Sequence, residues 1–429
     1  MYNLRGGFLV RPLAIALVLG AAGALSSWLE EDFPAVSNWV PHALFPSHAD
    51  PQVAQAILAG IGASAMTVVS IVFAILLMTL TLASMQFSPR IILGFARDGV
   101  TQWTLGVFLG TFCYCMTALP TARSKPYPFA PVATVTGAML LAFVCVAWLL
   151  FFIHHISGAI SVNQIVDKIA TETEAVVDEM MPWPRRGARL PVDNPSDGVK
   201  WELPVQNEVS GYIRFVDSRR LVALAKEHRV KVRVLCRVGR FVPQGAPLLL
   251  ITHAERATPD LAASLRGAFD FGPSRTLQQD VEFGVLQIVD IALKAISPAV
   301  NDPSTAISCV DQLSRILIRI ASREPPEYRL YDPPGVLRVV LSWYSFERLL
   351  DSAFEQIRMY SKSDVAVSLR ILRALDDVAS TTADPGIRKL LLDRAHRVLE
   401  GCAEKLHEHE IAPIRQRLRE MTASDSVSG

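Results

Sequence analysis

Long apolar runs dominate the first 160 positions of the chain, whereas the later positions mix apolar and charged residues. Four of these runs, residues 12–29, 53–88, 101–119 and 131–153, contain no Asp, Glu, Lys or Arg. A helix needs about 20 apolar residues to cross the hydrocarbon core of a bilayer, and a charge at its centre costs roughly 2.5–3.5 kcal/mol. The pattern therefore predicts an α-helical transmembrane domain of four spans over residues 1–160. It also argues against a proton-relay pump, because such pumps use carboxylates inside the membrane.

The distribution of cations between the runs predicts how the spans are oriented. Arg5 and Arg11 precede the first run, and Arg90 and Arg97 lie between the second and the third, whereas the loop of residues 30–52 has neither Lys nor Arg. Short loops rich in Lys and Arg stay on the cytoplasmic side. We therefore expect both termini in the cytoplasm, although two cations between the third and fourth runs lie on the opposite side.

The N-terminus also fits a signal peptide, with a basic start (MYNLRGG), an apolar core and a stretch of small residues (GAAGALSS). Cleavage of the first run is therefore the alternative to a first span. It would leave the orientation of the later helices unchanged.

The second run is unusually long and carries a patterned face. A helix of 36 residues would extend about 54 Å, so it must tilt, break near Gly60 and Gly62, or project from the membrane. Small and hydroxylated side chains recur on one side of it every three or four residues: Ala63, Thr67, Ser70, Ala74, Leu77, Thr81, Ser84 and Ser88. Such a stripe lets helices approach closely in lipid, or it lines a water-filled path when several copies surround an axis. Both interpretations stay open.

The remaining sequence predicts a cytoplasmic α+β region in three parts. Residues 161–202 continue the fourth span as a helix and end in a linker rich in Pro, Gly and Arg. Residues 203–255 alternate apolar and polar positions between glycine turns, which predicts a small basic β module of the barrel or sandwich kind. Residues 256–429 are helical in pattern. The β module resembles the barrel-sandwich fold of biotinyl and lipoyl carriers, but it lacks their modified lysine, so no carrier function or cofactor is expected.

The β module has a strongly basic stretch. Nine Lys or Arg against two acids lie between Gly211 and Arg240, and Arg229, Lys231 and Arg233 mark the face that we expect to carry the charge. Such a face is either simply solvated, or it meets anionic lipid or a small anionic ligand. No aromatic stacking platform or nucleic-acid motif accompanies the charge, so we expect no nucleic-acid partner.

A proline-rich corner, AISPAVNDPSTA, interrupts two apolar helical stretches at residues 295–306. Pro298 disfavours continuation of the first helix, and Pro303 suits the first turn of the next. Asp302 is then the expected N-cap residue, with its carboxylate accepting amide hydrogens from the next turn. The alternative is that Asn301 and Asp302, with free carbonyl groups at the broken helix end, hold a cation or a ligand.

No pattern in the sequence indicates an enzyme. The six cysteines have no metal-site or disulfide spacing, and no nucleophile elbow, phosphate loop or metalloprotease motif is present. Asp280, Glu282 and Asp290 are expected to be capping and surface residues of a helix rather than paired catalytic carboxylates. We therefore predict neither catalytic nor metal-binding nor cofactor-binding residues.

Several motifs together resemble one known family. The segments SMQFSPR, VFLGTFCYCM, FFIHHIS, SGYI, RTLQQDVEFG, AISPAVNDPSTA and FEQIRMYS are similar to those of bacterial predicted membrane proteins grouped as domain of unknown function 2254. The resemblance covers nearly the whole chain. It implies an integral protein of the bacterial inner membrane, and it implies no activity.

Two functions remain after these exclusions. A homo-oligomeric channel or passive transporter with a basic cytoplasmic vestibule fits the four spans, the striped helix and the basic module. A membrane-tethered binding or regulatory module without transport activity fits the large cytoplasmic part.

Overall fold

The computed structural model divides the chain into two compact units, Met1–Gln164 and Ile165–Gly429. The residues that the structure describes are 10–33, 50–86, 99–123, 128–159, 161–181, 201–324 and 328–428.

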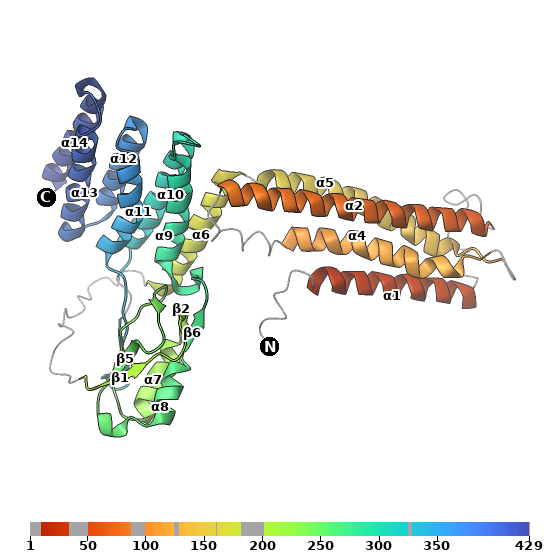
Figure 1. Ribbon diagram of the computed structural model, residues 1–429, viewed down its shortest axis with the longest axis horizontal. Helices are drawn as coiled ribbons and strands as arrows, with labels where there is room; N and C mark the ends of the chain where they lie inside the picture. Colours follow the sequence, from red (N-terminus) through yellow and green to blue (C-terminus); the bar gives the residue numbers. More distant parts are fainter. Residues whose placement is uncertain are drawn as a thin grey trace. The chain divides into compact units, whose positions relative to one another are not determined.

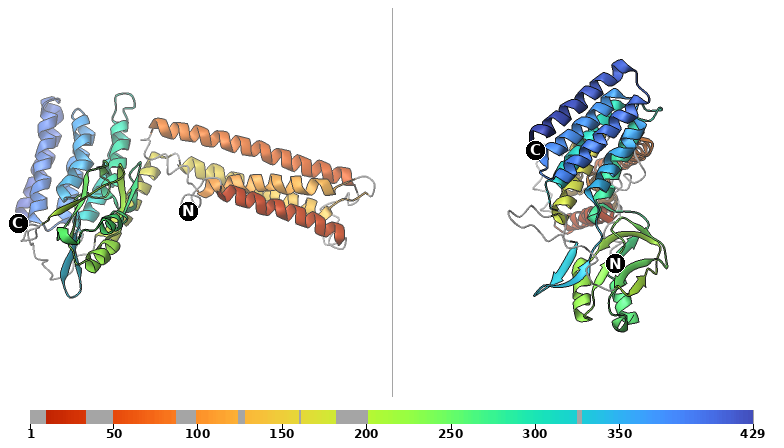
Figure 2. Two further views of the ribbon diagram at one scale, coloured as in Figure 1. Left: turned by 60° about the horizontal axis from the view of Figure 1, so that its bottom comes forward. Right: turned by 90° about the vertical axis from the view of Figure 1, so that its left-hand side faces the viewer.

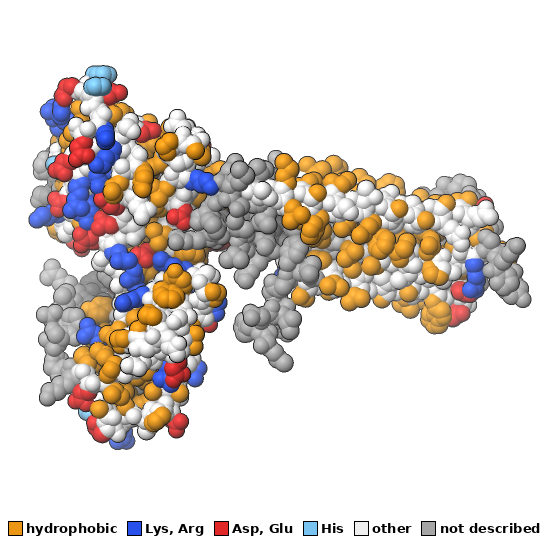
Figure 3. Space-filling view, viewed as in Figure 1, with side chains coloured by type: hydrophobic (Ala, Val, Ile, Leu, Met, Phe, Trp, Pro, Cys, Tyr) orange, Lys and Arg blue, Asp and Glu red, His pale blue; other side chains and the backbone are white. Residues whose placement is uncertain are grey.

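The first unit contains four helices that are long and apolar enough to cross a membrane. They run alongside one another (Figure 1) and are α1 (Val10–Asp32), α2 (Pro51–Gln86), α4 (Gly99–Ala118, followed by the 3-10 turn Leu119–Thr121) and α5 (Val132–Ala159). Hydrophobic side chains are spread along the face of these helices that Figure 3 shows, and charged side chains appear there only near one end. The prediction of four apolar helices is confirmed, and α2 is one unbroken helix of 36 residues.

Glycine residues allow α1 and α4 to pack closely. A Cβ atom added to Gly23 of α1 would lie 2.5 Å from the backbone oxygen of Tyr114 on α4. One added to Gly110 of α4 would lie 2.5 Å from Cδ1 of Leu19 on α1. At Gly23 the close atoms belong to the backbone, so only a residue without a side chain fits there, whereas at Gly110 the Leu19 side chain would have to shift. Small residues are common where helices cross in lipid.

A buried carboxylate joins the end of α1 to the start of α5. Glu30 is only 1% exposed. It accepts hydrogen bonds from the backbone nitrogens of Ala133 and Thr134 at 2.8 and 3.0 Å, and from the Thr134 hydroxyl at 3.0 Å. The first amide groups of a helix lack partners within the helix, and a negative charge there also interacts favourably with the helix dipole. Glu30 thus caps α5.

The second unit combines two sheets with a group of helices (Figure 1, Figure 2). One sheet has the strand order β1-β5-β3-β8-β7 and the other β4-β2-β6. The strands are β1 (Leu203–Gln206), β2 (Gly211–Val216), β3 (Val232–Val234), β4 (Phe241–Val242), β5 (Pro247–Ile251), β6 (Phe269–Gly272), β7 (Arg329–Asp332) and β8 (Val336–Val340). The helices α7 (Ser218–Glu227) and α8 (Pro259–Arg266) and the 3-10 turn Ala254–Arg256 belong to the same region.

This arrangement corrects the sequence-based division of the cytoplasmic part. The segment 256–429 is not entirely helical, because it contributes β6, β7 and β8. The hairpin of β7 and β8 joins the larger sheet through parallel pairing of β8 with β3. A strand that pairs with a segment about 100 residues earlier leaves little local signal in the sequence.

Helices form the rest of the second unit and stand side by side (Figure 1). They are α6 (Val162–Met180), α9 (Val281–Ala295, after the 3-10 turn Leu277–Gln279), α10 (Pro303–Ala321), α11 (Phe346–Tyr360), α12 (Val365–Thr381), α13 (Pro385–Ala403) and α14 (Glu408–Ser428). Five of them begin at a side chain that caps the first turn, namely Asp280, Asp302, Ser345, Asp364 and Asp384. Their starting points are therefore determined by local sequence.

Candidate functional site

The polar stripe of α2 lies on the helix surface that the first unit leaves uncovered. The side chains of Thr67, Ser70, Ala74, Leu77 and Thr81 are all exposed. By contrast, α2 packs into the unit through the opposite face: Ala54, Leu58, Ala65 and Val72 are 0 to 6% exposed. The side chain of Ser84 lies outside the described residues.

The hydroxyl groups of the stripe are bonded to their own helix. Thr67 donates to the carbonyl oxygen of Ala63 at 2.9 Å, Ser70 to that of Met66 at 3.1 Å, and Thr81 to that of Leu77 at 2.8 Å. These bonds use the hydroxyl hydrogens and leave oxygen lone pairs pointing outward. The stripe can therefore accept hydrogen bonds from water or from another helix.

The corner between α9 and α10 has a capped geometry. Asp302 accepts a hydrogen bond from the backbone nitrogen of Thr305 at 3.1 Å and one from the Thr305 hydroxyl at 2.6 Å. These hydrogen bonds lower the pKa of Asp302. Asn301 adopts a left-handed conformation with φ of 49°, which asparagine tolerates better than most residues. Among the described residues, no group of three or more His, Cys, Asp or Glu could hold a metal ion.

The basic stretch is partly neutralised by acids from elsewhere in the chain. Arg214 pairs with Asp270 at 2.8 Å, and Lys226 pairs with Asp332 at 2.9 Å. Strand β3 has the expected alternation, because Val232 and Val234 are buried.

The three cations singled out from the sequence lie just before β3 and within it. Arg229 is exposed, and Lys231 and Arg233 are half-buried. Within the part of the chain that the structure describes, none of these three forms an ion pair.

A buried ion cluster connects the β region with the helices. Asp280 is completely buried and caps α9 through the backbone nitrogen of Phe283 at 3.1 Å. Its carboxylate also forms two hydrogen bonds of 2.7 Å with Arg275, and the Tyr344 hydroxyl lies 2.7 Å from Oδ1. Close approach is possible because Gly239, with φ of 83°, has no side chain: a Cβ there would lie 2.1 Å from Oδ2 of Asp280.

Glu282 is the second carboxylate of this cluster and is 3% exposed. It pairs with Arg275 at 3.0 Å, Arg348 at 2.8 Å and Arg237 at 3.4 Å. Burial alone would raise the pKa of Glu282, but these guanidinium groups hold it below its usual value. Three arginines against two carboxylates leave one net positive charge in the cluster.

The sequence-based expectation for these acids was wrong in one respect. Asp280 does cap a helix, but Asp280 and Glu282 are not surface residues. Their partners Arg237, Tyr344 and Arg348 lie 45 to 66 positions away along the chain, so spacing within α9 could not indicate them. The sequence signal that could have indicated a charged cluster is the local motif RTLQQDVEFG, which places Arg275, Asp280 and Glu282 within eight residues.

Helix α6 is fixed to α10 by arginines, so it is part of the second unit and more than a linker. Arg315 pairs with Asp167 at 2.8 Å and also with Glu174. Asp178, near the end of α6, pairs with both Arg319 and Arg323. Residues 182–200, the expected linker, lie outside the described residues.

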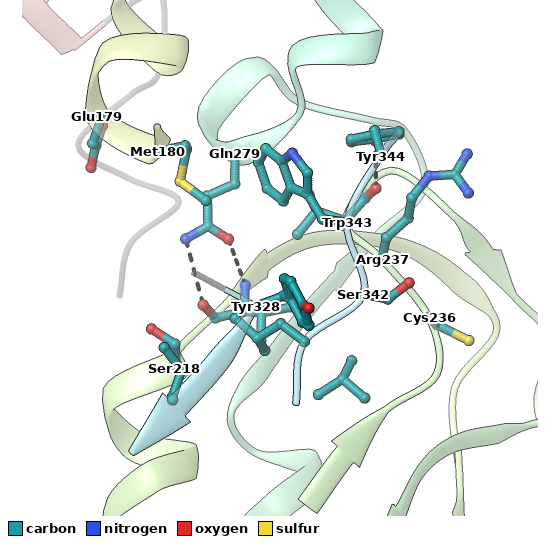
Figure 4. Close-up of a pocket in the computed structure, with 15 residues that line it drawn as sticks. Glu179, Met180, Ser218, Cys236, Arg237, Gln279, Tyr328, Ser342, Trp343 and Tyr344 are labelled. Atoms are coloured by element: carbon teal, nitrogen blue, oxygen red, sulfur yellow. Dashed lines mark hydrogen bonds between the residues drawn. The ribbon is translucent and has the colours of Figure 1, made fainter. Parts of the chain in front are cut away.

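A pocket of about 310 Å³ lies where the end of α6 meets the sheet and the segment after β8. Aromatic residues Tyr328, Trp343 and Tyr344 line it (Figure 4), together with aliphatic side chains from β2, β3 and β7. Cys236 also contributes, but burial raises the pKa of this thiol. A neutral thiol is a poor nucleophile, which gives no support for covalent chemistry.

These features define a membrane protein with a large α+β region, and comparison with known proteins identifies the family. The chain belongs to the family described as "Predicted membrane protein (DUF2254)", which it matches over residues 5–377. Uncharacterized proteins of Mycobacterium bovis and Mycobacterium tuberculosis are each 34% identical to it over 397 residues, covering 90% of this chain and 74% of theirs. No solved structure matches the chain significantly.

Proposed function

We propose that this protein is an oligomeric channel or passive transporter of the bacterial inner membrane, with the α2 stripe lining the permeation path. The observation that carries this proposal is the position of the stripe. Its residues lie on the face of α2 opposite the one buried in the first unit, so the described residues of that unit leave them exposed.

The side chains of the stripe are suited to contact with water. Hydroxyl-bearing residues every three or four positions offer outward lone pairs along α2. Exposed apolar side chains flank the stripe on both sides, among them Ile71 and Phe73 at 53% and 47%. These flanks would contact lipid or a second copy, and the hydroxyl groups would then face a common axis.

The second unit would serve as a basic vestibule on the cytoplasmic side. The positive-inside rule favours a cytoplasmic position for both termini. Arg229, Lys231 and Arg233 form no ion pair among the described residues, so they supply charge that attracts anions or anionic lipid.

Planar-bilayer recording of the purified protein tests this proposal. We expect discrete conductance steps from the wild type and a loss of most of the conductance in Ala74→Trp, because the indole ring would occupy the path. The matched control is Leu140→Trp on α5, where Leu140 is 62% exposed on a different helix. Conductance that is absent from the wild type across voltage and membrane tension, or unaffected by Ala74→Trp, would contradict the proposal.

The alternative is a membrane-tethered regulatory module. The size of the second unit, in which ion pairs fix α6 to α10, favours it, because a large folded unit suits a binding or regulatory role. This alternative predicts a folded protein with no conductance.

A further inference from the structure

Two buried hydrogen-bond donors in the pocket wall have no partner. Among the described residues, Nε1 of Trp343 and Nε of Arg237 are buried without a hydrogen bond, and both residues line the pocket. Buried donors are nearly always satisfied in folded proteins. Two such donors at one cavity therefore point to a ligand that brings acceptors.

The rest of the lining defines the shape of that ligand. In Figure 4, the rings of Tyr328 and Trp343 lie between Gln279 on one side and Ser342 and Arg237 on the other. The Gln279 amide is already engaged with the backbone of Val216 at 3.0 Å. Flat aromatic walls and a volume of about 310 Å³ suit a planar molecule, at the small end of ligand pockets.

The charge beside the pocket favours an anion. Arg237 lies over the Tyr344 ring at 4.6 Å and contacts Glu282 at 3.4 Å. It thereby connects the pocket to the buried cluster, whose three arginines exceed its two carboxylates by one charge. The acid in the lining, Glu179, is exposed at the end of α6, so water screens it more than the buried charges.

We propose that this pocket binds a small planar aromatic monoanion, such as an aromatic carboxylate. Its ring would lie against Tyr328 and Trp343, and its carboxylate oxygens would accept from Nε1 of Trp343 and from Arg237. The proposal does not depend on channel activity, because all of these residues belong to the second unit.

Saturation-transfer NMR with 2-naphthoate tests the proposal on the full chain in lipid nanodiscs, with empty nanodiscs as the blank. We expect saturable binding of 2-naphthoate and much weaker binding of two comparators, 2-naphthylmethylammonium and cyclohexanecarboxylate. The first comparator has the ring with the opposite charge, and the second has the charge without the aromatic ring. Equal binding of either comparator, or no binding of 2-naphthoate at millimolar concentration, would overturn the proposal.

Two variants locate the site. Trp343→Phe removes the N–H donor and should weaken binding about tenfold, the loss expected for one hydrogen bond. Ser342→Trp should fill the pocket and abolish binding, whereas Ser380→Trp, at an exposed position on α12, should leave it unchanged. Unaltered binding in both Trp343→Phe and Ser342→Trp would overturn the assignment, and a circular-dichroism melt verifies that each variant is folded.

Discussion

The guanidinium group of Arg275 donates two hydrogen bonds to the carboxylate of Asp280, from Nε to Oδ2 and from Nη2 to Oδ1, and both are 2.7 Å long. Asp280 is completely buried. The pair is therefore shielded from water, so leaving either charge unpaired would strongly destabilise the folded protein. It fixes the segment before α9 to the first turn of that helix. The Tyr344 hydroxyl, which lies 2.7 Å from Asp280 Oδ1 and 2.8 Å from the carbonyl oxygen of Val238, links the pair to the loop that carries Gly239.

The first prediction concerns this buried pair. Asp280→Asn leaves the three arginines of the cluster against the single carboxylate of Glu282, and removing one partner of a buried ion pair typically costs about 3–5 kcal/mol. For a unit of this size the melting temperature should fall by roughly 10 °C. Asp270→Asn is the matched control, because Asp270 pairs with Arg214 but its side chain is 51% exposed, and such surface pairs contribute about 0–1 kcal/mol. Equal melting temperatures of the two variants, measured by circular dichroism, would contradict this account.

The second prediction concerns the cap of α10. Asp302→Ala should destabilise the second unit by about 0.5–2 kcal/mol. Asp302→Asn should leave the stability at neutral pH nearly unchanged, because asparagine caps a helix equally well. If Asn were as damaging as Ala in thermal melts, the negative charge itself would matter, and a bound cation or ligand would be favoured over capping.

The same residue gives a pH prediction. Hydrogen bonds from Thr305 lower the pKa of Asp302 in the folded protein. Its contribution is therefore fully present above the unfolded pKa of about 4 and is lost as the pH falls through the lower folded value. Below about pH 4 the wild type should lose stability relative to Asp302→Asn, which does not titrate. A constant difference in melting temperature from pH 7 to pH 3 would contradict the mechanism.

The third prediction concerns helix packing in the membrane unit. Gly23→Ala would place a Cβ 2.5 Å from a backbone oxygen and 2.9 Å from Cα of Tyr114, and a backbone cannot move aside easily. We expect a clear loss of thermal stability in detergent, measured by size-exclusion chromatography after heating. Gly60→Ala on α2 is the control, because nothing lies within 4 Å of its added Cβ. Equal tolerance of both substitutions would show that α1 and α4 do not pack as described.

Sequence patterns captured the features that depend on neighbouring residues. The apolar runs predicted four helices, and Asp302 was expected where the structure places a cap, because both signals are local. The close approach of α1 and α4 was missed, although Gly106 and Gly110 are four residues apart and give the spacing of a helix-packing motif.

Long-range contacts explain the other differences. β8 pairs with β3 across about 100 residues, and Arg348 reaches Glu282 across 66. Such partners are determined by the folded chain rather than by local pattern. The α2 stripe was visible in the sequence, but only the structure shows that it lies opposite the packed face.

The fourth prediction concerns Leu77, the large apolar member of the described stripe, which is 53% exposed. In a pore such a ring of leucines would repel water and act as a hydrophobic gate. Leu77→Ser should therefore increase ion flux from proteoliposomes, whereas Met78→Ser, at the adjacent and 65% exposed position, should change it much less. A decrease of flux in Leu77→Ser would argue against a gate at this level.

The reactivity of single cysteines along α2 tests the central claim most directly. In a reconstituted protein without its native cysteines, a small charged thiol reagent should modify cysteines at Thr67, Ser70, Ala74 and Thr81. It should spare Val72, which is 1% exposed and faces the unit's interior. The account predicts this three-to-four-residue rhythm through the middle of the membrane, with current through the bilayer falling as modification proceeds. Reaction confined to the two ends of α2, in a folded sample held across a range of voltage and tension, would contradict a water-filled path along the stripe.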